Sequence, residues 1–511
     1  MFLNKSTLFT NFILMNLSFG SMFMTITVDA QDLSGTNSSS TNSSKTINTN
    51  VKSVLTFEMA IKTAQKNDPW LSGNAHQQQA LKLMGQASNS LPDPKVSFGL
   101  ANLPVGGFDF SQVAMTQAQI GISQVFPRGD TLALKSQQYK TQSEAFPYQR
   151  QDREAKVAVT VGRLWLEAYR AQQSITLIEN NRALFEQLAD VAQANYSSAL
   201  ARTRQQDIVR AQLELTRLEE RLDKLRQQKS QSEGMLFQWL INFADTANTT
   251  TADMNFYMDL YNVDFGEQLP QIDLHRFDLL DAEFSQQHQQ HHQQQQQQMQ
   301  SSQRVDSQRV RTSTLIQRFE YHPSVQAINK KITATKTQVH IAEQKYKPQW
   351  GVSASYGYRD DAPSSITGAA GIERDDLFSI GISFDLPIFT ENKQDKEVQS
   401  AISKTEAVKT EKLLLLRELL SAYSNISARL DGVKRRQSLY KSKLLPQIHD
   451  NAEATLSAYN NDDGDFLEVV RSRIAVLNTE IDELNLDVDE QQLNLELNYM
   501  FIGNNVTAGD K

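Results

Sequence analysis

Long stretches of the chain repeat their hydrophobic residues every three or four positions. Three such series are Val157, Val161, Leu164, Ala168, Ala171, Ile175 and Ile178; Ile208, Ala211, Leu215, Leu218, Leu222 and Leu225; and Ile474, Leu477, Ile481, Leu484 and Val488. This spacing keeps one seam of a helix facing a partner helix, as in coiled coils. The pattern predicts very long paired helices. One, from Gly129 to Tyr196, would be roughly 100 Å long at 1.5 Å per residue.

Short segments elsewhere follow a period of two. In Trp350–Tyr358 and in Phe378–Leu386, apolar residues alternate with glycine, serine or another polar residue, and Val96, Phe98 and Leu100 alternate with Ser97 and Gly99. Such alternation predicts strands with one apolar and one small polar face. We expect strands at about 94–103, 117–127, 348–359 and 376–388. Their length suits tilted membrane strands, and a hairpin packed on a helix is the alternative.

The same order of landmarks occurs twice. Asn67-Asp68-Pro69 matches Tyr321-His322-Pro323, 254 residues later, and Ile120-Gly121-Ile122-Ser123 matches Ile380-Gly381-Ile382-Ser383, 260 residues later. We therefore predict two structural repeats, 51–250 and 314–500. Each carries a helix, two strands and a long helical hairpin; the hairpins are expected at 129–241 and 390–497. The linker 251–313 contains a Gln/His tract, and 501–511 form a tail.

The amino-acid composition excludes several kinds of covalent and metal chemistry. The 511 residues include no cysteine, so disulfides, Cys-ligated metals, thiol nucleophiles and a cysteine-linked lipid are excluded. The net charge of −8 argues against a nucleic-acid partner, which would favour a basic surface. The mean hydropathy is −0.48. Residues 1–30 resemble a secretory signal peptide, with a disordered leader as the alternative, and the Ser/Thr/Asn-rich residues 31–50 predict a disordered tether.

Several motifs resemble those of TolC-type outer-membrane efflux channels, the outer membrane factor family. The motifs are Leu55–Ala60 in the first helix, Ile122–Gly129 at a strand-to-helix junction, Tyr196–Ala201 with Gln206–Ile208 at the first helical tip, and Leu444–Pro446, Ala458-Tyr459 and Asp465–Leu467 at the second. The resemblance covers nearly all of the chain after the tether. Its order of helix, strand pair and long helix is more specific than any single motif.

The resemblance implies a mainly α fold with a membrane β-barrel. It implies a homotrimer in which each copy gives four strands to one 12-stranded barrel in the outer-membrane lipid, continued by a coiled-coil α-helical barrel across the periplasm. A periplasmic adaptor protein and an inner-membrane pump of the resistance-nodulation-division type are the implied partners. This places the protein in the outer membrane of a Gram-negative bacterium. The lack of a modified cysteine departs from many lipid-anchored relatives.

Within that family, Met115–Pro127 most resembles the heavy-metal branch, which serves cation-exporting pumps. Multidrug or small-molecule efflux, or a type I secretion duct, are the alternatives. From another class, a periplasmic adaptor would need a single hairpin with a lipoyl-like or β-barrel domain, and a structural coiled-coil protein would not need proline-bounded strand pairs. No phosphate-binding glycine loop or Gly-x-Ser-x-Gly motif occurs, so we expect a passive duct rather than an enzyme, with no cofactor.

The helical tips carry the candidate gate residues. Asp462, Asp463 and Asp465 surround Gly464 at the second tip, and Asp207, Arg202 and Arg204 lie at the first. In a trimer each acid becomes a ring of three, which would favour cations at the periplasmic mouth. The structural alternative is a tight turn at Gly464 with an aspartate capping the next helix. The arginines could hold the mouth closed, or simply be solvated.

Histidines and aromatic residues offer weaker candidates. His288, His291 and His292 lie in the Gln-rich tract and could bind copper, zinc or nickel, but a disordered low-complexity insertion between the repeats is the favoured interpretation. Trp350, Tyr356 and Tyr358 suit a girdle at a membrane interface, with ordinary packing as the alternative. Asn102–Gln117 and Arg359–Asp376 are expected to be extracellular loops.

Overall fold

The computed structural model describes residues 54–197, 205–241, 263–273, 312–361, 373–461 and 463–503, which all lie within one unit, Lys52–Lys511. The segments expected to be a signal peptide (1–30) and a tether (31–50) lie outside the described residues. So do the Gln/His tract with His288, His291 and His292, the two arginines of the first tip, Arg202 and Arg204, and Asp462 of the second.

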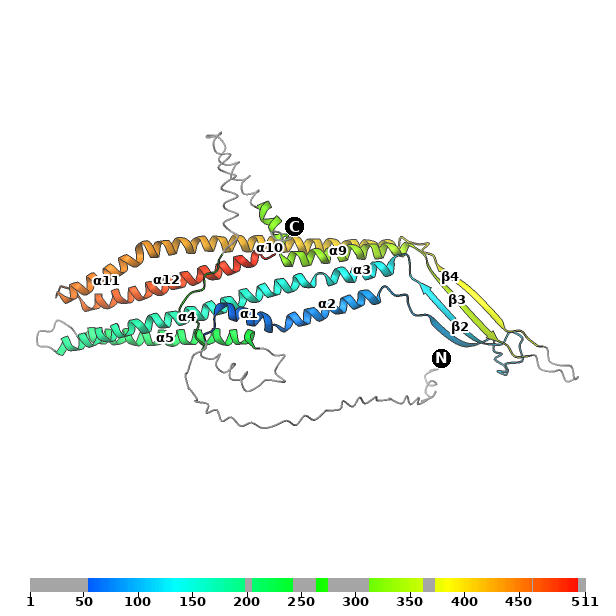
Figure 1. Cartoon of the computed structure of the whole chain (residues 1–511), viewed down its shortest axis with the longest axis horizontal. Helices are drawn as coiled ribbons and strands as arrows, with labels where there is room; N and C mark the ends of the chain where they lie inside the picture. The colour runs from blue at the N-terminus through cyan, green and yellow to red at the C-terminus, as the bar shows by residue number, and fades with distance from the viewer. Residues whose placement is uncertain are drawn as a thin grey trace, which may run out of the picture. The chain divides into compact units, whose positions relative to one another are not determined.

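Two series of elements follow one another along the chain (Figure 1). The first is α1 (Phe57–Asn67), α2 (Pro69–Ala87), β1 (Lys95–Ala101), β2 (Gln117–Phe126), α3 (Thr131–Ser143), α4 (Phe146–Ser197) and α5 (Gln205–Leu240). The second is α9 (Pro323–Glu343), a short 3-10 helix (Gln344–Tyr346), β3 (Gln349–Tyr358), β4 (Leu377–Asp385), α10 (Gln394–Leu439), a π-helix (Tyr440–Leu444), α11 (Leu445–Asn460) and α12 (Phe466–Met500).

Helices α2 and α9, one in each series, begin in the same way. Pro69 and Pro323 occupy the first positions of α2 and α9, where a missing backbone N–H costs nothing. The preceding residue caps each helix: the Asp68 carboxylate accepts from the backbone N–H of Trp70, and the His322 ring accepts from that of Ser324. The matched landmarks in the sequence therefore build matched turns, although the two capping side chains differ chemically.

Prolines also interrupt the long helices. The hydrophobic period predicts one helix from Gly129 to Tyr196, but this expectation is wrong, because α3 ends at Ser143 and α4 begins at Phe146. Pro147 has no N–H and its ring would collide with the carbonyl of Ser143 in a continuous helix. Four residues before Pro446, the second hairpin widens into a π-helix for the same reason.

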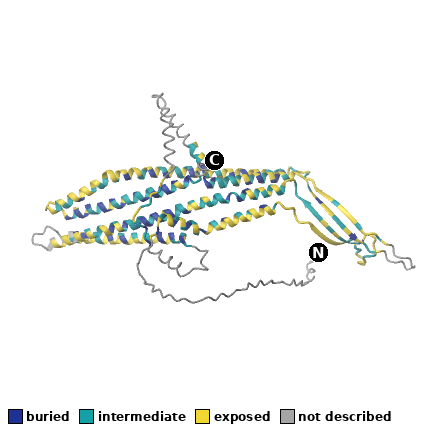
Figure 2. Ribbon diagram, viewed as in Figure 1, coloured by how far each residue is buried: buried dark blue, intermediate teal, exposed yellow. Residues whose placement is uncertain are grey.

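The long helices pack in pairs along their apolar seams. Helix α4 packs against α5, α11 and α10 pack against α12, and α12 packs against α4, so that the two hairpins share one interface. Figure 2 shows buried residues along the facing sides of these helices. Val157, Val161, Ala168, Ala171 and Ile178 of α4 are all buried, as are Leu477, Ile481 and Val488 of α12. The seams read from the sequence are therefore the helix–helix interfaces.

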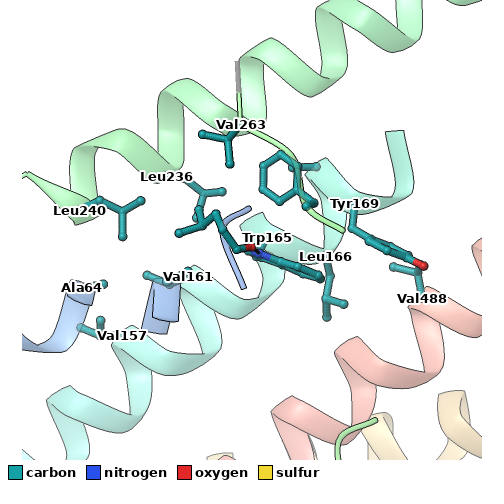
Figure 3. Packing of buried hydrophobic residues seen from close by; sticks show 14 residues of the cluster. Ala64, Val157, Val161, Trp165, Leu166, Tyr169, Leu236, Leu240, Val263 and Val488 are labelled. Carbon is teal, nitrogen blue, oxygen red and sulfur yellow. Dashed lines mark hydrogen bonds between the residues drawn. The ribbon is translucent and has the colours of Figure 1, made fainter. Parts of the chain in front are cut away.

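Trp165 is the centre of the largest apolar cluster (Figure 3). Its side chain is 2% exposed, and its indole N–H donates to the carbonyl of Leu55 over 2.7 Å. Rings of Phe57, Tyr169 and Phe265 surround it at centroid distances of 5.5, 5.5 and 5.7 Å. These neighbours come from α1, α4 and the segment 263–273, so Trp165 joins three parts of the chain that are distant in sequence.

The segment 263–273 crosses from the first repeat to the second. Its Asp264 carbonyl accepts from the backbone N–H of Leu55, and its Glu267 carbonyl accepts from the Tyr169 hydroxyl. Farther along, the Ile272 N–H donates to the side chain of Gln491 in α12 over 2.8 Å. This segment therefore ties α1 and α4 to α12 through backbone hydrogen bonds.

The four strands form one antiparallel sheet in the order β1-β2-β3-β4. Ile120 of β2 lies opposite Phe98 of β1 and Tyr356 of β3, which in turn lies opposite Phe378 of β4. The pairing of β2 with β3 joins the two repeats. Strand β4 ends at Asp385, short of the 376–388 expected from the sequence, because Pro387 lacks the N–H that would continue the ladder.

Replacing Trp165 with alanine is expected to lower the free energy of unfolding by about 3–5 kcal/mol, because the change leaves a cavity and an unpaired carbonyl at Leu55. The matched control is Trp70→Ala, since Trp70 is 40% exposed and mainly stacks on the Arg153 guanidinium. That control should cost about 1 kcal/mol. Urea unfolding followed by circular dichroism measures both. Equal losses in the two variants would contradict the central role of Trp165.

His322 is expected to make folding stability depend on pH. Burial lowers the pKa of its ring from 6.5, an effect to which Lys156 adds and which Asp152 and the Tyr499 carbonyl oppose. Because the folded pKa is depressed, the unfolded state binds more protons below pH 6.5, and stability falls as pH falls through this range. Well above pH 6.5, where the ring is neutral in both states, this contribution is constant.

The variant His322→Asn keeps a capping acceptor but does not titrate. Unfolding midpoints between about pH 8 and pH 5 should therefore fall less steeply for this variant than for the wild type. The exposed His76 supplies the control His76→Asn, whose pH profile should match the wild type. Parallel profiles for all three proteins would exclude His322 as the titrating group.

Candidate functional site

One face of the sheet is apolar and exposed. Opposite residues in an antiparallel sheet share a face, so the register gives the rows Val96, Ile122, Ala354 and Ile380; Phe98, Ile120, Tyr356 and Phe378; Gln124, Val352 and Ile382; and Phe126, Trp350 and Phe384. Phe98 is 79% exposed and Ile380 is 70% exposed. Figure 2 shows β1 and β4 almost entirely as exposed. Apolar surface of this extent, rimmed by polar residues, marks an interaction face.

The other face carries small and polar side chains. Its rows are Ser97, Gly121, Ser355 and Ser379; Lys95, Ser123, Ser353 and Gly381; Gly99, Gln119, Gly357 and Leu377; and Val125, Gly351 and Ser383. The Gln119 amide donates to the Ser355 hydroxyl over 3.1 Å. Two charged residues lie on this face: Lys95 at the start of β1, and Asp385, which lies opposite Gln349 at the end of β4.

Two glycines of the polar face lie close to serine side chains on neighbouring strands. A Cβ added at Gly121 would lie 2.9 Å from the Ser97 hydroxyl, and one at Gly381 would lie 2.8 Å from the Ser353 hydroxyl. At Gly99 of the same face an added Cβ would meet nothing within 4 Å. A larger side chain at Gly121 or Gly381 would therefore displace a serine hydroxyl, while Gly99 has room.

Each outer strand of this sheet keeps a free edge among the described residues, because β1 pairs only with β2 and β4 only with β3. A row of unpaired backbone N–H and C=O groups invites another strand. In lipid these groups would each cost several kcal/mol if left unpaired. The apolar face and the free edges are therefore surfaces that the described residues leave uncovered.

Charged residues join the strands to the helices. Arg128, just after β2, donates to the Lys345 carbonyl over 2.6 Å and approaches the Asp385 carboxylate at the end of β4 at 3.5 Å. Gly129 has a φ of +47°, and an added Cβ there would lie 2.4 Å from the Gln344 side chain. This junction therefore links both repeats at the base of the sheet and leaves space only for glycine.

Two arginines connect the loops at the other end of the sheet. Arg359 donates to the carbonyl of Ala114 over 3.3 Å and to that of Asp375, and Arg374 donates to the carbonyl of Ser111 over 3.2 Å. The loop after β1 is thereby tied to the loop after β3. The sequence indicated exposed loops at these positions but did not distinguish these arginines, each of which directly precedes two aspartates.

The three aromatic candidates all lie on the apolar face. Trp350 stacks on Phe126 at a centroid distance of 4.4 Å, and Tyr358 stacks on Phe110 at 6.4 Å. The Tyr356 hydroxyl donates to the Asp376 carboxylate. Trp350 and Tyr358 are at opposite ends of β3, and Tyr356 lies between them. The three aromatic side chains therefore do not lie at one level of the sheet, as a girdle at one membrane interface would.

The second helical tip is a turn between α11 and α12. The Asp465 carboxylate caps α12 by accepting from the backbone N–H of Leu467 over 3.2 Å. A Cβ added at Gly464 would lie 2.7 Å from the backbone nitrogen of Tyr459, so the turn is tight. Asp463 is exposed. The structure therefore assigns the capping role to Asp465 and leaves Asp463 open to solvent.

The first tip is only partly described. Residues 198–204 are outside the described range, and Asp207 is in the first turn of α5 without a described side chain. Above the tips, the hairpins meet through Phe185 and Leu188 of α4 and Phe466 and Val469 of α12, which belong to one apolar cluster. The Arg221 guanidinium donates to the Asn478 side chain across the hairpins over 2.5 Å.

The described part of the chain contains no group of three or more His, Asp or Glu side chains placed to hold a metal ion. His340 faces Glu343 at 2.9 Å, and His449 faces Glu480 at 3.7 Å. Nor does any helix of this part have the length and apolar character needed to cross a membrane.

Neither the protein-family models nor the curated proteins include a match to this sequence. Solved structures do match. The outer membrane protein VceC from Vibrio cholerae superposes with a TM-score of 0.64 and 12% identity, over 88% of this chain and 96% of that chain. The Campylobacter jejuni CmeC outer membrane channel gives a TM-score of 0.61 and 10% identity, over 88% of this chain and 85% of that chain.

The Neisseria gonorrhoeae MtrE outer membrane channel, in its open state, matches with a TM-score of 0.59 and 12% identity, over 87% of this chain and 88% of that chain. Identities this low establish the fold alone. The match spans most of each chain, so it includes both repeats rather than one shared hairpin. The protein therefore has the fold of outer membrane channels.

Proposed function

We propose that the protein is an outer-membrane exit duct of an efflux system. Three copies would combine their four-stranded sheets into one 12-stranded barrel, and their helical hairpins would continue the duct into the periplasm. The observation that carries the proposal is the two-faced sheet with free outer edges. Lipid covers the apolar face, the Ser/Gly/Gln face lines the water-filled interior, and pairing of β4 with β1 of the next copy closes the edges.

The duct conducts passively in this proposal. An inner-membrane pump, of the resistance-nodulation-division type, supplies the energy, and a periplasmic adaptor protein connects it to the helical tips. The polar face of the sheet supports a passive path, because serine, glycine and glutamine bind no solute strongly. Heavy-metal cations are the favoured cargo, through the resemblance of Met115–Pro127 and the acidic second tip; small-molecule export is the alternative.

Neighbouring residues of β4 provide a test of the two faces. Ile380→Lys puts a charge on the apolar face, at a cost of about 2–4 kcal/mol near the middle of a bilayer, and should abolish insertion. Ser379→Lys puts the same charge on the polar face and should assemble normally with a changed ion preference. Heat-modifiable migration of the membrane-extracted oligomer and single-channel conductance measure the outcomes. A soluble monomer from the wild-type chain, or equal behaviour of the two variants, would overturn the proposal.

The aspartates of the second tip provide a separate test. If Asp462 and Asp463 line a gate as rings of three, the double change Asp462→Asn and Asp463→Asn should lower the cation preference of the channel without changing its assembly. Asp482→Asn, on an exposed position of α12 away from the tip, is the control. Reversal potentials in a salt gradient measure the preference. An unchanged preference in the double variant would remove these residues from the gate.

A further inference from the structure

A lysine-lined groove lies next to the base of the sheet. It has a volume of about 410 Å³ and runs between α9 and α10. Four lysines and one glutamate line it, together with uncharged side chains: Lys345, Lys393, Lys396, Lys404 and Glu397, with Gln338, Ile341, Ala342, Asn392, Ser400 and Ala401. The lining therefore has three more positive than negative charges.

Three of the four lysines that line the groove have no acidic partner among the described residues. Glu397 pairs with Lys345 at 2.9 Å, and Asp395 accepts from the Tyr346 hydroxyl at 2.5 Å. Glu391 is exposed and does not line the groove. Lys396 reaches only the Gln399 side chain, at 3.4 Å, and among the described residues neither Lys393 nor Lys404 makes an ion pair. The groove thus presents ammonium groups that have no acid of their own.

An exposed apolar segment leads from the sheet to this groove. After β4, the apolar side chains of Leu386, Ile388 and Phe389 are exposed, and Phe389 is 86% exposed. The groove begins three residues later, at Asn392. The chain thus passes from apolar residues to cationic residues within a few positions. This order matches that of the acyl chain and the head group in a lipid.

We propose that this groove binds the phosphate of an anionic glycerophospholipid whose acyl chains lie along β4 and the segment 386–389. The inference rests on the proposed membrane position of the sheet. Lys393 and Lys396 contact the head group, because each lies within one helical turn of the start of α10. Lys404 lies about 12 Å farther along α10 than Lys396, beyond a head-group layer of about 5–8 Å.

The test uses the full-length oligomer in detergent with phosphatidylglycerol or phosphatidylcholine, and native mass spectrometry to count bound lipids during a titration. The wild type should retain phosphatidylglycerol in preference to phosphatidylcholine. The double variant Lys393→Gln and Lys396→Gln should weaken phosphatidylglycerol binding by about 25-fold, fivefold for each lysine at a lipid surface. Lys404→Gln should weaken it less than about twofold, because its distance exceeds the screening length.

The matched control is Lys434→Gln with Lys443→Gln, which removes two exposed lysines from the same helical rod, remote from the sheet. It should retain lipid as the wild type does. Equal losses in the double variant and this control would overturn the groove assignment. Displacement of the lipid by inorganic phosphate at the same concentration would also overturn it, since the site would then bind free phosphate rather than a lipid.

The same preparation separates this inference from the proposed function. A wild-type chain that forms no heat-modifiable oligomer overturns both. A heat-modifiable oligomer that conducts ions but binds phosphatidylglycerol and phosphatidylcholine equally overturns the lipid site alone. In the double variant, unchanged oligomer migration with lost phosphatidylglycerol preference supports the site and excludes misfolding as the cause.

Discussion

An apolar sheet face with no covering layer among the described residues is the constraint on which the architecture depends. Side chains such as Phe98, Phe378 and Ile380 leave large apolar areas exposed, at about 25 cal/mol per Å² relative to burial. The helices of the same chain pack against one another along their own apolar seams. No described helix covers this sheet face, and in the proposed function lipid covers it over the full width of the sheet.

That constraint explains the polar face and the duplication. A sheet with lipid on one side and water on the other needs strict alternation along every strand. The water side carries mainly small residues, and Gly121 lies close to Ser97 and Gly381 close to Ser353. Each repeat supplies only two strands, and the β2–β3 pairing joins the repeats into one sheet. Free edges at β1 and β4 then leave the closure to other copies in the proposed trimer.

The long helices must remain paired over tens of residues without a globular core. Seams such as Val157 to Ile178 supply the pairing, and Trp165 anchors it where α1, α4 and the segment 263–273 meet. Proline positions decide where the helices begin, break or widen. Asp68 and His322 cap equivalent helices, so the two repeats share a backbone plan, but the buried cap is a carboxylate in the first repeat and an imidazole in the second.

The sequence by itself determined the period of each element, the two repeats and the seam residues, because hydrophobic spacing and proline chemistry act locally along the chain. It also indicated the turn at Gly464 and an aspartate cap next to it. Only the tertiary structure decided which aspartate caps α12, that the helix from Gly129 breaks before Pro147, and that Arg359 and Arg374 tie two loops together. It alone placed Lys393 and Lys396 in one groove with Lys345. The arginine contacts and the groove depend on residues far apart in the chain, which no local pattern records. The cap and the helix break involve residues within four positions of one another, and there the local pattern left more than one outcome open.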